Sequence, residues 1–395
     1  MAEKFDVSEL TFETLDRVRG YLGWLLERQG SDLHIKANSQ VRCRINGEIV
    51  PVDNAIMTKK DALVFSKELL RNRFSEFVQK KELDLVFPYD DKVRFRVNIF
   101  FQMDGVSAVF RMIPINIISM DELKMPSAVK KLVEMDRGLV LVVGVTGSGK
   151  STTLAAMINE INKNSRRHIL TIEDPIEFVH KDNKSIVNQR SIGQDTHSFA
   201  DALRASLRED PDIILVGEMR DAETINIALH AAETGHLVFS TLHTVDAKET
   251  INRIIATFDK EEQNRIRLTL SSVLRGILAQ RLVPTIDGKR TAAIEILLNT
   301  PRISTLIMDN RDSEILESVE EGKEVYGMQS FDQALFDLHQ KGFISELEAL
   351  NYATSKSDLK LKISGINSNI DAKDSMLTNK NEKIFSEDEI YSLKV

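Results

Sequence analysis

The sequence predicts an α/β protein, and three observations carry this prediction. Short, fully apolar runs over 139–143, 169–172, 213–216 and 237–240 alternate with helical segments, which is typical of a parallel sheet covered on both faces. A glycine-rich loop follows the first of these runs directly. The 395 residues are 42% hydrophobic and 28% charged, as in an ordinary globular protein with room for two or three domains.

The composition excludes several classes of protein. The longest apolar run, 138–145, has eight residues, well short of the ~18 that a membrane helix needs. The single cysteine, Cys43, excludes an internal disulfide and a four-cysteine zinc site. The formal net charge of −8 does not indicate a nucleic-acid partner. Glu3 and Asp6 lie where a secretory signal would be basic, so we expect a cytoplasmic protein.

The first part of the chain predicts an α+β domain over 21–113, preceded by an extension or opening helix over 1–20. We expect a hairpin over 33–52 turned by Asn46-Gly47, a helix over 60–80, and a strand over 93–99 that returns after a turn at Asp104-Gly105. In the 93–99 strand, apolar residues alternate with polar ones, which indicates that one face is buried.

The second part predicts an α/β domain over 122–365, reached through a linker over 114–121. From about 255 to 363 the apolar spacing is helical, and Ser345 begins a segment with the spacing of a capping box. The residues 366–395 are rich in Asn, Ser, Lys and Asp, which predicts a mobile tail.

The glycine-rich loop has the pattern of a phosphate-binding loop, G-x-x-x-x-G-K-[ST]. It consists of Gly144, Val145, Thr146, Gly147, Ser148, Gly149, Lys150 and Ser151, between an apolar strand and a helix. Glycines let the backbone close around a phosphate, and free N–H groups at the start of the helix face the anion. We expect Lys150 to bridge the β- and γ-phosphates of ATP and the Ser151 hydroxyl to bind Mg²⁺.

Acidic residues follow two of the other apolar runs. The run 213–216 ends in Gly217-Glu218, so Glu218 supplies the carboxylate expected to position or deprotonate the attacking water. Glu173 follows the run 169–172 and is expected to act on Mg²⁺ through a water molecule. A solvated acidic loop is the alternative, and it is stronger for Glu177 than for Glu173.

Two histidines flank the run 237–240. His236 precedes it and His243 follows it shortly afterwards. Residues at opposite ends of one strand cannot both face the same phosphate, so the sequence leaves open which of them is catalytic.

Three arginines are expected on one face of the 93–113 hairpin. A turn at Asp104-Gly105 would place Arg111 opposite Asn98, beside Arg96 and near Arg94. Like charges on neighbouring strands repel one another unless an anion is supplied. The nucleotide of a neighbouring subunit could be that anion, as with arginine fingers, and a water-facing sheet edge is the alternative.

In order and spacing, the motifs resemble those of the secretion-type ATPases that power type IV pili, from about residue 22 to residue 363. The loop 144–152, which includes Thr152, resembles their Walker A motif. The segments 172–178 and 217–218 resemble their Asp box and atypical Walker B motif, and 234–243 resembles their His box. Residues 31–35 and 327–335 resemble the retraction branch, the PilT/PilU family, whereas 297–307 and 358–363 look more like its PilU-type members.

The resemblance implies a PAS-like N-terminal domain and a RecA-like ATPase domain, assembled in a hexameric ring. It implies ATP and Mg²⁺ as cofactors, catalytic roles for Glu218, Glu173 and both His236 and His243, and arginines that reach a shared nucleotide. The implied partners are the chain itself, an inner-membrane pilus platform protein and a companion PilT-type ATPase, at the inner face of the cytoplasmic membrane.

The sequence leaves three functions open. The first is an ATP-driven motor that drives or assists pilus retraction in twitching motility. The second is a regulatory ring partner that binds nucleotide and hydrolyses little of it. The PilU-like segment 297–307 favours this function. The third is a DNA translocase, against which the acidic balance and the lack of a basic stripe argue.

Overall fold

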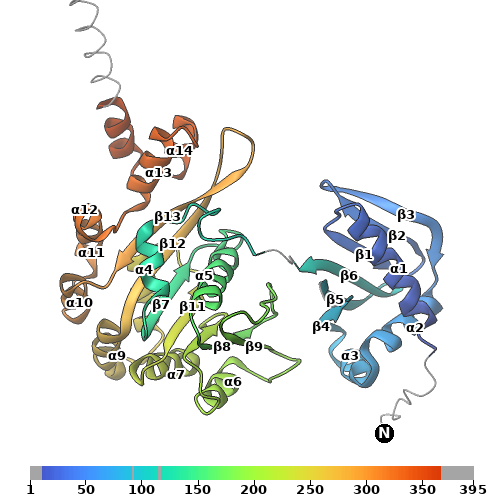
Figure 1. Cartoon of the computed structure of the whole chain (residues 1–395). Helices are drawn as coiled ribbons and strands as arrows, with labels where there is room; N and C mark the ends of the chain where they lie inside the picture. Colours follow the sequence, from blue (N-terminus) through green and yellow to red (C-terminus); the bar gives the residue numbers. More distant parts are fainter. Residues whose placement is uncertain (1–10, 91–92, 114–116, 366–395) are drawn as a thin grey trace, which may run out of the picture. The chain divides into compact units, whose positions relative to one another are not determined.

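The computed structural model describes residues 11–90, 93–113 and 117–365, and within them the chain forms two separate β-sheets with their own helices (Figure 1). The α/β class is confirmed. The predicted tail over 366–395, the first ten residues and 114–116 of the predicted linker lie outside the described residues. No helix in the described ranges is both long enough and apolar enough to cross a membrane.

The N-terminal sheet has the strand order β3-β2-β1-β6-β5-β4, and each neighbouring pair is antiparallel. Its elements are α1 (Glu13–Glu27), β1 (Asp32–Lys36), β2 (Ser39–Ile45), β3 (Glu48–Met57), α2 (Lys59–Leu70), α3 (Phe74–Lys80), β4 (Glu82–Pro88), β5 (Arg94–Gln102) and β6 (Gly105–Ile113). Helices α1 and α2 contribute Leu22 and Phe65 to the core, where the Phe65 ring lies 6.0 Å from that of Phe110 on β6.

Two predictions for this part are corrected. The segment 33–52 is not one hairpin, because Asn38 adopts a positive φ of 57° and separates β1 from β2. The predicted Asn46-Gly47 turn does join β2 to β3. The helix over 60–80 is interrupted at Arg71, whose φ of 49° ends α2 before α3 begins.

The β5–β6 turn lies one residue earlier than predicted. Gln102 pairs with Gly105, so Met103 and Asp104 form the two-residue loop. Arg111 therefore lies opposite Arg96 and not opposite Asn98. Directly opposed residues and residues two apart share a face, so Arg94, Arg96 and Arg111 still share one face.

The C-terminal sheet has the strand order β13-β12-β7-β11-β10-β8-β9. Its elements up to β11 are α4 (Ser127–Val133), β7 (Gly138–Val143), α5 (Lys150–Asn164), β8 (His168–Glu173), β9 (Ile186–Ser191), α6 (Phe199–Ser206), β10 (Ile213–Val216), α7 (Ala222–Glu233) and β11 (Leu237–Leu242). The four predicted apolar strands are confirmed as β7, β8, β10 and β11, and β10 runs parallel to both β8 and β11.

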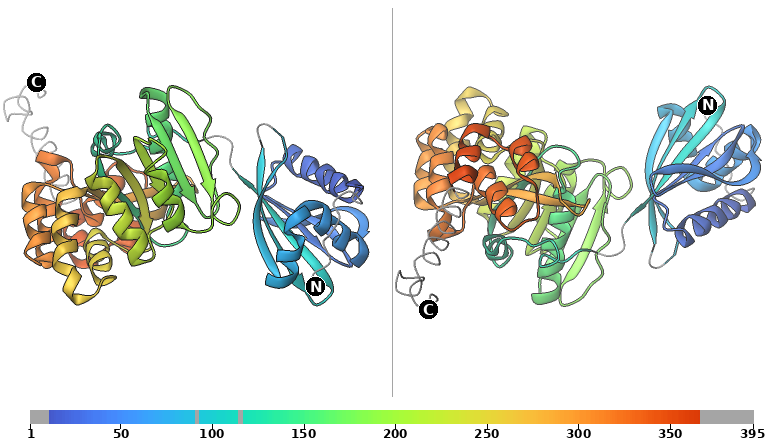
Figure 2. Two further views of the ribbon diagram at one scale, coloured as in Figure 1. Left: turned by 90° about the horizontal axis from the view of Figure 1, so that it is seen from below. Right: turned by 90° about the horizontal axis from the view of Figure 1, so that it is seen from above.

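The remaining elements lie beyond β11. They are α8 (Ala247–Ala256), α9 (Lys260–Val273), β12 (Leu274–Pro284), β13 (Arg290–Leu298), α10 (Pro301–Met308), α11 (Ile315–Glu321), α12 (Lys323–Tyr326), α13 (Phe331–Gln340), α14 (Glu346–Tyr352) and a final helix over 356–365. Figure 2 shows α10–α14, in orange and red, gathered beside the β12–β13 side of the sheet.

The prediction of continuous helical structure from about 255 to 363 is wrong between 274 and 298. There β12 and β13 form a long antiparallel pair. Leu274, Ile277 and Leu278 have the spacing of a helix face, but β12 is buried over most of its length, so apolar spacing alone cannot separate the two structures. The predicted helix start at Ser345 is confirmed, since its hydroxyl accepts a hydrogen bond from the Glu348 N–H.

Candidate nucleotide-binding and hydrolysis site

The phosphate-binding loop joins the buried strand β7 to helix α5, as predicted. Gly144, Gly147 and Gly149 have φ values of 146°, 80° and 94°, a region that side chains rarely tolerate. A Cβ on Gly144 would also lie 2.6 Å from the Gln280 carbonyl oxygen. The loop therefore requires glycine on both conformational and steric grounds.

Lys150 is buried, and its ammonium lies inside the loop. Its Nζ donates hydrogen bonds to the carbonyl oxygens of Gly144 at 2.7 Å and Val145 at 3.1 Å. The same nitrogen lies 3.5 Å from His243 Nδ1. Among the described residues, the buried Ser148 Oγ has no hydrogen-bond partner. A positive charge, an unsatisfied hydroxyl and a helix start are the features that fit a bound phosphate, so the residues present suit a nucleotide.

Glu173 lies at the end of β8 with a set of its own hydrogen bonds. Its Oε1 accepts from Thr171 Oγ1 at 2.6 Å and Gln189 Nε2 at 3.2 Å, and its Oε2 accepts from the Glu177 N–H at 3.4 Å. Burial raises the pKa of Glu173 and outweighs these hydrogen bonds, which lower it. A nearby cation would favour the charged form again, which is consistent with a place beside Mg²⁺.

The structure explains why the strand β10 is followed by Gly217. A Cβ at this position would lie 3.1 Å from the Ile172 carbonyl oxygen and 3.3 Å from Glu173 Cα. The Gly217 N–H donates to that Ile172 oxygen at 2.7 Å, and its carbonyl accepts from Thr241 Oγ1 at 2.6 Å. A side chain would press on backbone atoms here, and the carboxylate is carried by the next residue, Glu218.

Glu218 forms an ion pair with Arg220, with 2.7 Å between Oε2 and Nη2. The Glu218 side chain is 17% exposed and that of Arg220 is 69% exposed. The carboxylate raises the pKa of Arg220 through hydrogen bonding and charge. Sequence analysis missed Arg220, although its place two residues after Glu218 was a usable signal, because residues two apart on an extended segment share a side.

The two histidines lie at opposite ends of β11. His243 follows β11 and approaches Lys150, as described above. His236 precedes β11, and its Nδ1 lies 2.9 Å from the Ala231 carbonyl oxygen at the end of α7. The His236 carbonyl accepts from the Gly138 N–H at the start of β7, at the end of that strand remote from the phosphate-binding loop. The structure brings His243 to the candidate site and leaves His236 away from it.

Two of the three arginines predicted on β5 and β6 have a carboxylate partner within the chain. Arg111 Nε donates to Asp32 Oδ1 at 2.8 Å, and Arg96 Nε lies 3.9 Å from Asp84 Oδ1. Arg111 and Arg96 are nevertheless 71% and 44% exposed, so their guanidinium groups remain open to a further anion. Sequence analysis did not identify Asp32 as a partner, because strands β1 and β6 are far apart in sequence.

The four motifs follow four neighbouring strands. Walker A-like residues follow β7, His243 follows β11, Glu218 follows β10 and Glu173 ends β8, and these strands are consecutive in the sheet order. In open α/β sheets, ligands bind beyond the carboxyl ends of the strands. The arrangement can therefore bind a nucleotide and present carboxylates to a metal ion and a water molecule.

Comparisons with known proteins agree with this arrangement. A family model described as "Type II/IV secretion system protein" matches residues 18–311. The chain is 46% identical to the "Type IV pilus retractation ATPase PilT" of Pseudomonas aeruginosa, over 83% of this chain and 95% of that protein. It is 43% identical to the "Type IV pilus ATPase PilU" of the same organism, over 86% of this chain and 89% of that protein.

A solved structure is similar over nearly the same length. The crystal structure of the pilus retraction motor PilT with bound ADP superposes with a TM-score of 0.81 at 41% identity, covering 87% of this chain and 98% of that one. The identities to PilT and PilU differ by little, so they do not decide between the two branches. With a glycine-rich loop, carboxylates on neighbouring strands and these relatives, the chain belongs to the type II/IV secretion ATPase family, among its PilT and PilU type IV pilus ATPases.

Proposed function

We propose that this protein is an ATP-hydrolysing motor that drives or assists retraction of type IV pili. The observation that carries the proposal is the loop 144–151, whose three positive-φ glycines surround the buried Lys150. Relatives that are named for pilus retraction and twitching motility indicate the cellular process. The intact set of hydrolysis residues favours an enzyme over a purely regulatory ring.

ATP binds with its phosphates against the N–H groups of the loop and the start of α5. Lys150 moves its hydrogen bonds from the loop carbonyls to the β- and γ-phosphates. Ser151 would supply a hydroxyl ligand to Mg²⁺, and Thr152 lies in the same first turn of the helix. A bound Mg²⁺ would neutralise developing charge on the phosphates.

Glu218 orients or deprotonates the attacking water, and Arg220 holds the carboxylate in place before ATP binds. Glu173 would help to hold Mg²⁺ through a water molecule. Its hydrogen bonds from Thr171 and Gln189 fix the direction of the carboxylate. His243, beside Lys150, belongs to this site.

The protein works as a ring, which we propose to be a hexamer. Arg94, Arg96 and Arg111 of one subunit stabilise the charge on a neighbouring subunit's nucleotide. This proposal is supported by their shared face and their exposure. The N-terminal part, 21–113, is a PAS-like domain, and 122–365 is a RecA-like domain that swings about the linker 114–121.

The ring acts at the cytoplasmic face of the inner membrane, on a pilus platform protein, and without nucleic acid. If the chain assists retraction as a PilU-type protein, a companion PilT-type ATPase takes part in retraction with it. Deleting the gene with and without the companion gene, scored by surface pili and surface motility, separates a motor that acts alone from one that assists.

The biochemical test is ATP turnover and nucleotide binding by the purified full chain. Lys150→Ala loses both, whereas Glu218→Gln retains binding and loses turnover by about a hundredfold or more. Glu324→Gln, an exposed acid on α12, is the matched control and keeps both. Turnover that survives in Glu218→Gln removes the assigned role of that residue. A folded wild-type chain that binds no magnesium nucleotide refutes the proposal.

A further inference from the structure

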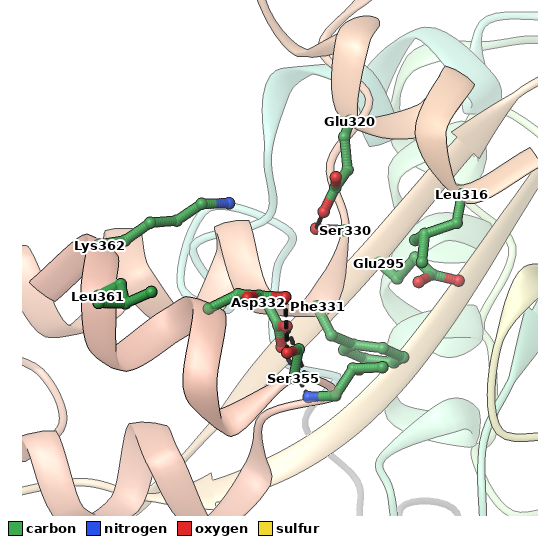
Figure 3. Close-up of a pocket in the computed structure, with 11 residues that line it drawn as sticks. Glu295, Leu316, Glu320, Ser330, Phe331, Asp332, Ser355, Leu361 and Lys362 are labelled. Atoms are coloured by element: carbon green, nitrogen blue, oxygen red, sulfur yellow. Dashed lines mark hydrogen bonds between the residues drawn. The ribbon is translucent and has the colours of Figure 1, made fainter.

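A pocket of about 460 Å³ lies among the C-terminal helices (Figure 3). Its walls come from β13, α11, the start of α13 and the segment 354–362. The segments 327–335 and 358–363, which the ATPase site does not use, build much of it. Its charged lining is mostly acidic, with Glu295, Glu320, Asp332 and Asp358 against Lys362.

Glu295 is the buried carboxylate of this pocket, with 5% of its surface exposed. Its Oε1 accepts a hydrogen bond from the Ala247 N–H at 2.8 Å, and its other oxygen has no hydrogen-bond or ion-pair partner among the described residues. Half of the carboxylate is thus left without a protein partner, in a side chain that is almost wholly buried. An unpaired buried charge is costly unless a cation reaches it.

The charged groups around Glu295 offset one another. Arg281 on β12 lowers the pKa of Glu295, whereas Asp246 before α8 and Asp332 on α13 raise it. Arg281 is engaged elsewhere, since it donates to the Tyr352 carbonyl oxygen at 2.7 Å and lies over the Phe331 ring at 3.7 Å. Figure 3 shows Lys362 and Glu295 apart, with Asp332 drawn between them.

The other carboxylates of the pocket have structural tasks that keep them in place. Asp332 accepts from the Thr354 and Ser355 N–H groups at 2.7 and 2.8 Å, at the start of the final helix. Glu320 accepts from Ser330 Oγ at 2.9 Å. These bonds hold negatively charged side chains around Glu295, whose second oxygen makes no such hydrogen bond.

The rim of the pocket is apolar and exposed. Leu316 on α11 is 41% exposed and Leu361 on the final helix is 72% exposed. A basic side chain has an apolar stem and a charged end, and it would therefore match both the rim and the interior. Hot spots of protein interfaces are commonly arginines inserted into such desolvated pockets.

We propose that this pocket binds an arginine or lysine side chain, flanked by apolar residues, from a segment of a partner protein. The cationic end pairs with Glu295, and the flanking residues pack on Leu316 and Leu361. Charge complementarity with a lining of four carboxylates and one lysine carries the choice of a basic partner. The inference goes beyond ATP hydrolysis and does not depend on it, because binding is measured without nucleotide.

The test uses the full chain and the peptide acetyl-Leu-Arg-Leu-amide, followed by ligand-observed NMR. Its neutral counterpart carries citrulline, which has nearly the shape of arginine without the charge. We expect the arginine peptide to bind, and the citrulline peptide to bind about tenfold more weakly or worse. Glu295→Gln weakens binding of the arginine peptide to the same extent. Glu324→Gln, the matched loss of a charge outside the pocket, leaves that binding unchanged.

Leu361→Ala, at an exposed position where folding is not at stake, weakens binding of both peptides. This variant separates the contribution of the rim from that of the interior. Binding should also weaken at pH 5, because burial raises the pKa of Glu295 to about 7 and a protonated carboxyl does not pair with a cation. Equal binding of the two peptides overturns the proposal, as does equal binding by wild type and Glu295→Gln. Peptide binding seen only where the chain is monomeric also overturns it, since a second copy would then be the occupant.

Discussion

Asp32 and Arg111 lie directly opposite each other on the adjacent antiparallel strands β1 and β6, and Arg111 Nε donates to Asp32 Oδ1 at 2.8 Å. The carboxylate is buried and the guanidinium is largely exposed. Ser31 Oγ donates to the second carboxylate oxygen at 2.7 Å. Burial alone would raise the pKa of Asp32, but the hydrogen bonds from Ser31 and Arg111 outweigh it and the pKa is lowered. A fixed anion therefore holds the arginine with its remaining donors turned towards solvent.

We expect Arg111→Ala to lower ATP turnover by about a hundredfold or more, because arginine fingers contribute at least that much. The expected cause is loss of a group that acts on a neighbouring subunit's nucleotide. Mixing Arg111→Ala subunits with Lys150→Ala subunits should then restore part of the turnover, since each supplies what the other lacks. The measurement is turnover as a function of mixing ratio. Arg302→Ala, which removes an exposed arginine on α10, is the control and should stay near wild type.

A mixture that stays as inactive as its components would place the arginine's action within its own subunit. Loss of the ring in Arg111→Ala, seen by sedimentation, would make the residue a contact of assembly. Either result contradicts the arginine-finger role. Asp32→Asn should lower turnover by less than Arg111→Ala, because it releases the guanidinium without removing it.

Gly217→Ala is expected to destabilise the fold by about 1–3 kcal/mol, the usual cost of inserting an extra methyl group into close packing. The new Cβ would lie 3.1 Å from the Ile172 carbonyl oxygen, in backbone that cannot move aside cheaply. Thermal unfolding measures the effect. Gly20→Ala is the matched control, because nothing lies within 4 Å of its Cβ position in α1. It should stabilise the chain by about 0.5–1 kcal/mol, and equal melting temperatures for the two variants would contradict the steric account.

The strands and the phosphate-binding loop could be predicted from sequence because their signals are local. The run 139–143 is buried at every position, and the glycines of the loop have the positive φ values that their spacing suggested. The pair β12–β13 could not be predicted, because Leu274, Ile277 and Leu278 also fit a helix and only pairing over a long stretch of strand decides between them.

The site was predictable in its residue types and not in its contacts. The loop lysine and Glu218 follow from motif and strand order, whereas Arg220, Asp32 and Gln189 act through contacts that the fold makes. The predicted register of the β5–β6 hairpin was wrong because Asp104-Gly105 has the favoured sequence of a two-residue turn, whereas the strands pair around Met103-Asp104, one residue earlier. Which histidine meets the nucleotide is decided by the end of β11 on which it lies.

Glu295→Gln should stabilise the protein at pH 8 and change little at pH 5. Burial raises the pKa of Glu295 from 4.5 in the unfolded chain to about 7 in the fold. Folding therefore favours the protonated form, and the charged form costs stability that grows from about pH 4.5 and levels off above pH 7. The full effect is on the order of 3 kcal/mol. Unfolding midpoints at both pH values, with Glu324→Gln as the control, measure it; a variant that is equally destabilised at pH 5 and pH 8 would contradict the assigned pKa.

His243→Ala and His236→Ala should separate catalysis from stability. His243 Nδ1 lies 3.5 Å from Lys150 Nζ, so its removal should lower turnover by about ten- to a hundredfold and leave the melting temperature nearly unchanged. His236 is bound to the end of α7 through Ala231. Its removal should cost about 1 kcal/mol of stability and leave turnover per folded subunit within about twofold, a change too small to count as loss of a catalytic group. Turnover and thermal unfolding of the same preparations measure both effects. If His236→Ala lost turnover as His243→Ala does while keeping its melting temperature, the histidine that precedes β11 would act on the reaction. The assignment of the catalytic histidine by strand end would then be wrong.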